Sequence, residues 1–101
     1  MANYLLVYHG GGGMAATPEA QQAAMAQWGQ WFGQLGAAVV DGGNPVGQER
    51  TIGGNGAAAN AVSGYSVLKA DSLDAAVKLT EGCPVLAAGG SVQVCETFDA
   101  M

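Results

Sequence analysis

Positive charge is scarce in this sequence: three lysines and arginines stand against eight acidic residues, for a formal net charge of −5. Proteins that bind nucleic acid neutralise phosphates with clustered Lys and Arg. Here Arg50, Lys69 and Lys78 are scattered along the chain. The same shortage argues against binding to an anionic membrane surface. We therefore expect neither nucleic acid nor a membrane among the partners.

Long apolar runs and metal-binding cysteine spacings are missing as well. No stretch approaches the ~20 apolar residues of a membrane span, and the N-terminus lacks the features of a signal peptide. The two cysteines, Cys83 and Cys95, do not have the spacing of a metal site. The sequence thus predicts a cytoplasmic protein with reduced thiols, no metal and no cofactor.

What the chain does have is apolar content and glycine: half of its 101 residues are hydrophobic and 17 are Gly. This composition is typical of a folded chain and excludes a disordered one. The glycines cluster between periodic segments, which marks those clusters as loops. The length predicts a single domain spanning residues 1–101.

The stretch 3–9 reads as a strand that is apolar on both sides. Alternation gives two sets, Tyr4, Leu6 and Tyr8 on one side and Leu5, Val7 and His9 on the other. A strand with one solvated side would alternate apolar with polar residues. We expect helices to cover one side and a second copy of the chain to cover the other.

A long helix follows the first glycine cluster. Thr17, Pro18 and Glu19 are typical of a helix start, and Gly36 suits its left-handed end. An apolar stripe at spacings of three and four comprises Met25, Trp28, Phe32 and Leu35. Trp31 lies off this stripe, toward its edge.

The second half of the chain supplies the remaining elements. We expect strands over 37–41, 61–70 and 91–98, the last with Val92, Val94 and Phe98 together. Residues 46–52 form a polar segment, either an exposed strand or irregular. A second helix begins after Asp71 or Ser72 and ends near Gly82.

This order predicts an α+β fold, a ferredoxin-like βαββαβ antiparallel sheet with two helices on one face. The other face is left bare and apolar, which predicts a homodimer and leaves higher assemblies open.

Several segments resemble the YCII-related family. They are residues 63–76 (SGYSVLKADSLDAA), Cys83-Pro84, 89–94 (GGSVQV), 4–8 (YLLVY) and the helix with Trp28, Phe32 and Gly36. The resemblance implies a dimeric α/β barrel, usually a homodimer with a cleft between sheet and helices. It implies little about activity.

Two motifs of that family are absent. In one branch a proposed catalytic His–Asp pair lies on the long helix, and the matching positions here are Met25 and Gln34. Neither side chain can act as a general acid or base. Another branch has an Asp-Gly-Pro-Phe segment where this chain has residues 53–60, without it. The resemblance therefore extends to the fold of the family more than to either of its two proposed sites.

Two residues are candidates for catalysis. His9 is the single histidine, and it could serve as a general base or acid, since its pKa lies near ~6.5. Alternatively it is a strand-end polar residue satisfied by backbone or water, which we favour. Asp41 could orient His9 if the strand ends meet, or it forms a turn before Gly42, which we also favour.

Four residues are candidates for ligand binding. Arg50 could hold a carboxylate or phosphate, or pair with Glu49 on the surface. Tyr8, Tyr65 and Trp31 could line a pocket, although strand aromatics are more often core or interface.

Two hypotheses of function follow. The preferred one is a homodimeric module that binds a small molecule or is structural, without catalysis. The alternative is a cofactor-free enzyme of isomerase, lyase or oxygenase type acting on a small apolar or aromatic compound, with His9 as base, Asp41 as its orienter and Arg50 as anion holder.

Overall fold

A four-stranded antiparallel sheet forms the centre of the protein. The computed structural model describes residues 2–10, 17–53 and 62–99. The strands are β1 (Ala2–His9), β2 (Val39–Asp41), β3 (Val62–Ala70) and β4 (Ser91–Glu96), in the order β2-β3-β1-β4. The central strand β1 pairs antiparallel with both β3 and β4. The predicted α+β ferredoxin-like fold is confirmed.

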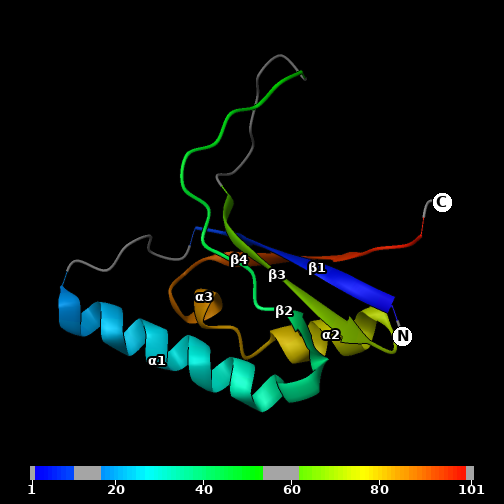
Figure 1. The fold of residues 1–101 in the computed structure, drawn as a ribbon, viewed down its shortest axis with the longest axis horizontal. Helices are drawn as coiled ribbons and strands as arrows, with labels where there is room; N and C mark the ends of the chain where they lie inside the picture. Colours follow the sequence, from blue (N-terminus) through cyan, green and yellow to red (C-terminus); the bar gives the residue numbers. More distant parts are fainter. Residues whose placement is uncertain (1, 11–16, 54–61, 100–101) are drawn as a thin grey trace.

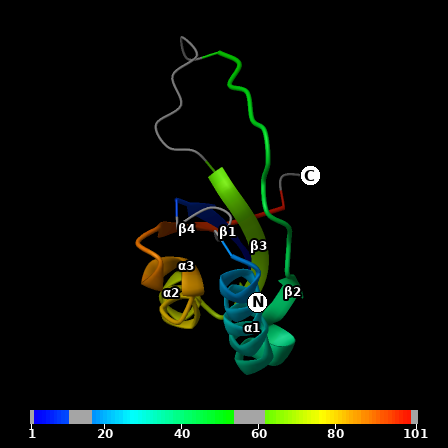
Figure 2. The same cartoon turned by 90° about the vertical axis from the view of Figure 1, so that its left-hand side faces the viewer.

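Three helices lie on one side of this sheet (Figures 1 and 2). They are α1 (Pro18–Leu35), α2 (Leu73–Thr80) and the short α3 (Pro84–Ala87). The sequence analysis did not predict α3. It begins at Pro84, because a proline is well suited to the first position of a helix. The same residue prevents a preceding helix from continuing through it.

Local side-chain hydrogen bonds explain where the two longer helices begin. The Thr17 hydroxyl accepts from the Ala20 N–H at 3.1 Å, and the Ser72 hydroxyl accepts from the Ala75 N–H at the same distance. Each satisfies one backbone donor that has no partner within its helix. Of the two caps considered for α2, the structure uses Ser72.

Two strand predictions were too long. Residues 36–38 form a 3₁₀ turn, so β2 covers only the last three residues of the predicted strand. At the other end of the chain β4 stops at Glu96, and Phe98 is 85% exposed rather than packed with Val92 and Val94. The Thr97 N–H donates to the Asn3 carbonyl at 3.0 Å, near the start of β1. Beyond this point β1 has almost no residues left with which β4 could pair.

The core lies between the sheet and the helices. Its buried members come from both layers and are Leu6, Tyr8, Trp31, Leu68, Cys83 and Val85. A second cluster comprises Tyr4, Ala70 and Ala76. Alternation along β1 and β3 therefore directs Tyr4, Leu6, Tyr8 and Leu68 toward the helices. The grouping of Tyr4, Leu6 and Tyr8 on one side of β1 is as predicted.

The helical stripe was assigned wrongly at two positions. Trp31 is the buried residue of α1, at 4% exposed, whereas Met25 is 73% exposed. The α1 side chains in or against the core are Trp28, Trp31, Phe32 and Leu35, and Met25 is not among them. Trp31 instead faces α2, where its indole Nε1–H donates to the Leu79 carbonyl at 3.2 Å.

A tight turn leads the chain out of β2. Asp41 Oδ1 accepts from the Gly43 N–H at 2.8 Å, and Gly43 has a φ of +75°. A side chain at position 43 would overlap the Tyr65 carbonyl of β3. Both the backbone angle and this close approach require glycine.

Candidate functional site

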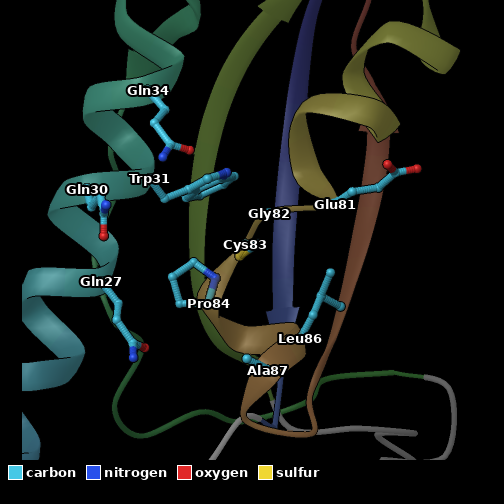
Figure 3. Close-up of a pocket in the computed structure, with 10 residues that line it drawn as sticks. All are labelled: Gln27, Gln30, Trp31, Gln34, Glu81, Gly82, Cys83, Pro84, Leu86 and Ala87. Carbon is cyan, nitrogen blue, oxygen red and sulfur yellow. The ribbon is translucent and has the colours of Figure 1, made fainter.

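An open groove of about 320 Å³ lies between α1 and the segment 81–87 that includes α3 (Figure 3). The lining of the groove comprises Gln27, Gln30, Trp31, Gln34, Glu81, Gly82, Cys83, Pro84, Leu86 and Ala87. It is formed by two walls that are remote in sequence. We take it as the candidate site.

Three glutamines form the α1 wall of the groove. Gln27, Gln30 and Gln34 are spaced by three and four residues, so they share one side of the helix. All three are exposed, and Figure 3 shows them along the groove. Each amide offers two N–H donors and a carbonyl acceptor. This wall therefore presents neutral hydrogen-bonding groups.

The floor of the groove is apolar and closely packed. Trp31 lies here, with its ring centroid 5.1 Å from Phe32 and 5.7 Å from Trp28. A Cβ at Gly82 would come within 3.3 Å of the Trp31 indole. Glycine at this position lets the opposite wall lie directly against the indole.

Below the floor, a chain of hydrogen bonds connects the core to the β2 turn. The Tyr8 hydroxyl donates to Ser66 Oγ at 2.7 Å, and Ser66 Oγ donates to the Gly42 carbonyl at 2.7 Å. The Cys83 thiol is in hydrogen-bonding contact with Tyr8. Burial raises the pKa of Tyr8 and the pKa of Cys83, so both groups stay protonated at neutral pH. Neither is an activated nucleophile.

The structure does not bring His9 and Asp41 together. His9 Nε2 lies 3.4 Å from Gln93 Oε1 on β4. Asp41 aligns with Val67, which pairs with Leu5, four residues before His9. At ~3.3 Å per residue this separates the two levels by about 13 Å along the sheet. Asp41 instead accepts from the Gly43 N–H, the turn alternative described above.

The four ligand-binding candidates are also divided. Trp31 is on the floor of the groove and Tyr8 lies beneath it. Tyr65 projects from the other face of the sheet, where its hydroxyl is 3.4 Å from Asn44 Nδ2. Arg50 is exposed in the irregular segment after β2. These residues do not form one pocket.

Sequence reasoning missed the glutamines as a site. The available signal was their spacing of three and four residues beside Trp31. Gln34, one of the two positions aligned with the family's His–Asp pair, does line the groove. The other, Met25, is exposed outside that lining. The comparison with the Asp-Gly-Pro-Phe segment concerns residues 53–60, nearly all of which lie outside the described residues.

Among the described residues, no group of three or more His, Cys, Asp and Glu side chains is placed to hold a metal ion. None of the described helices has the length and apolar character needed to cross a membrane.

Comparison with known proteins agrees with the fold and the motifs. A model of the YCII-related domain matches residues 1–99. The chain therefore belongs to the YCII-related family. A search of curated proteins found no match.

Proposed function

We propose that this member of the YCII-related family is a homodimeric module that binds a small neutral molecule in the groove and does not catalyse a reaction. The observation that supports it most directly is the row of three glutamine amides facing segment 81–87 across the indole of Trp31. These groups can orient a ligand by hydrogen bonds and apolar contact. They supply no acid–base pair.

The buried polar groups near the groove are already satisfied. The Trp31 N–H bonds the Leu79 carbonyl, and the Tyr8 hydroxyl bonds Ser66. Within the described residues, no buried side-chain N or O atom lacks a hydrogen-bond partner. Recognition therefore falls to the exposed amides, which can pair with hydroxyl, carbonyl or amide groups of a ligand.

Charge favours a neutral ligand over an anion. Among the described lining residues Glu81 is the one charged side chain, and the chain as a whole carries −5. A carboxylate or phosphate would meet repulsion without a cation to offset it. A small ring compound bearing hydroxyl or carboxamide groups fits this groove best.

The homodimer is supported by the uncovered side of the sheet. Leu5, Val7, Tyr65, Val67 and Cys95, which we call the open face, point away from the helices by alternation and register. Figures 1 and 2 place all three helices on the opposite side. A contiguous apolar face of this kind is typical of association, and a two-fold pair closes on itself.

Ligand binding can be tested by thermal unfolding with a panel of neutral sugars, nucleosides and carboxamides, each beside a carboxylate or phosphate analogue. A neutral ligand should raise the midpoint with concentration, because binding to the folded state stabilises it. Gln30→Leu and Gln34→Leu should abolish the increase. Gln22→Leu, an exposed α1 residue outside the groove, is the matched control. Equal shifts in all variants would contradict the groove as the site.

The homodimer can be tested by sedimentation velocity at micromolar concentration. The expected species has twice the chain mass of 10.0 kDa, about 20 kDa. A single 10.0 kDa species at all concentrations would contradict it.

The alternative, a cofactor-free enzyme using His9 and Asp41, requires these two side chains to share a proton. Their separation along the sheet argues against that arrangement. His9→Ala should accordingly leave ligand binding in the groove unchanged.

A further inference from the structure

Residues 42–53, which we call the arm, leave the end of β2 and extend to the side of the sheet opposite the helices (Figures 1 and 2). The base of the arm is held against β3. Val46 N–H donates to the Ser63 carbonyl at 3.0 Å, and Tyr65 N–H donates to the Asn44 carbonyl at 3.3 Å. The direction of the arm is therefore set by backbone hydrogen bonds to the sheet.

Further out, the arm carries an uncovered apolar side chain. Glu49 Oε2 still accepts from the Val62 N–H at 3.1 Å, at the start of β3. Beyond this contact Ile52 is 97% exposed. Isoleucine is among the residue types most often buried in folded proteins. The described residues of the chain offer Ile52 almost no cover.

The open face and the arm point to the same side of the molecule. Tyr65 and Val67 of the open face belong to β3, the strand that holds the base of the arm. A second copy seated on the open face would lie beside the arm, and two-fold symmetry would place its own arm beside the first copy. We infer that each arm clasps the partner and buries Ile52 against it.

This inference rests on the proposed homodimer, and it commits to a second copy as the occupant. Glu49 and Arg50 are the charged residues among the described arm residues, one of each sign. The described arm is thus neutral overall and carries the aliphatic Ile52 near its outer end, which suits an apolar protein surface. Because the arm lies beside the open face, the protein surface that it contacts is that of the second copy seated on the open face.

The first experiment measures the dimer dissociation constant by sedimentation velocity for the native protein, Ile52→Asp and Val77→Asp. Val77 is 41% exposed on α2, on the helix side, and serves as the matched control. Ile52→Asp should raise the dissociation constant at least tenfold, since it places a charge where an aliphatic side chain is buried. Val77→Asp should leave it unchanged. Circular dichroism checks that each variant is folded.

The second experiment uses trypsin, because Arg50 is an exposed cleavage site within the arm. If the arm docks, cleavage after Arg50 in the native protein should slow as concentration rises through the dissociation constant. In Ile52→Asp the rate should stay at its dilute value at those same concentrations.

The outcomes separate this inference from the homodimer itself. Two results would contradict docking of the arm while leaving the homodimer supported. One is a dissociation constant that is the same in Ile52→Asp as in the native dimer, and the other is cleavage after Arg50 that does not slow as the native dimer forms. A native protein that is monomeric at every concentration overturns both.

Discussion

The two faces of the sheet carry similar side chains in very different surroundings. On the helix face, Tyr4, Leu6 and Leu68 are at most 1% exposed. On the open face, Leu5 and Val67 are only half-buried by their neighbours within one chain. The strands are apolar on both sides, so the difference comes from what covers them. A strand that is apolar on both sides therefore indicates that each side is to be shielded from water. It does not show whether helices or another chain shield a given side.

The two faces should also contribute to different equilibria. Burial of apolar area stabilises by roughly 25 cal/mol per Å² wherever the area leaves water. On the helix face this happens when one chain folds. On the open face of the proposed homodimer it would happen when two chains associate, so its contribution would depend on protein concentration.

The largest difference between the two faces is expected when one core residue and its neighbour on the other face are truncated in turn. Leu6→Ala should lower the free energy of unfolding by about 2–5 kcal/mol at any protein concentration, because it leaves a cavity in the core. Leu5→Ala should cost less, and its effect should grow with concentration. Urea unfolding at two concentrations measures both. If both variants lose the same free energy of unfolding, independent of protein concentration, the two faces are equivalent.

A charge on the open face should separate association from folding. Val67→Asp should weaken the dimer by about 2 kcal/mol, roughly thirtyfold, because the carboxylate must be desolvated in an apolar interface. The circular dichroism spectrum should be unchanged, since this position does not face the core. Val77→Asp, at a 41% exposed position of α2 on the helix side, is the control. A Val67→Asp dimer of native affinity would contradict the open face as the interface.

The stability of the helix face should also depend on pH through Tyr8. Burial raises the pKa of Tyr8 in the folded state above its value of 10.0 in the unfolded chain. The stability from keeping Tyr8 neutral is thus complete below pH ~10 and is lost as the pH rises above it, because only the unfolded state then ionises.

Tyr8→Phe should cost about 1 kcal/mol at pH 8, from the lost hydrogen bond to Ser66, and should reduce the alkaline loss. Tyr65→Phe on the open face should keep that loss, since Tyr8 remains in place. Urea unfolding at pH 8 and above pH 10 measures both. A Tyr8→Phe variant with the native alkaline loss would be inconsistent with this origin.

The smallest effect concerns the two thiols, which lie on opposite faces. Cys83 is 2% exposed and its pKa is raised by burial, so it should react slowly with a thiol reagent at every concentration. Cys95 on the open face should react faster in dilute solution and more slowly as the dimer forms. Reaction rates with Cys83→Ser and Cys95→Ser assign each phase. Rates for Cys95 that are independent of concentration would contradict cover by a second copy.

Much of the fold could be predicted because its signals are local. Thr17 and Ser72 mark helix starts through hydrogen bonds that span three residues. The alternation of β1 likewise depends only on neighbours. The core position of Trp31 could not be predicted in this way, since a helix carries apolar residues on several sides. Which side becomes buried depends on α2, 48 residues away at the Leu79 contact.

The candidate site shows the same limit. The sequence singled out His9, Asp41 and Arg50 as reactive types, but their placement in the sheet depends on register and on the course of the chain after β2. The groove joins a helix face to a turn more than 40 residues later. No spacing within either segment indicates that they meet.

From the sequence alone came the order of the four strands and the two longer helices, the family, the shortage of cations, and the apolar character of both sides of β1. These follow from composition, periodicity and short-range hydrogen bonds. The three-dimensional arrangement was needed to show that Trp31 rather than Met25 is buried, that three glutamines face segment 81–87, and that the arm extends beside the open face. Each of those depends on contacts between segments far apart in the chain, which local chemistry does not specify.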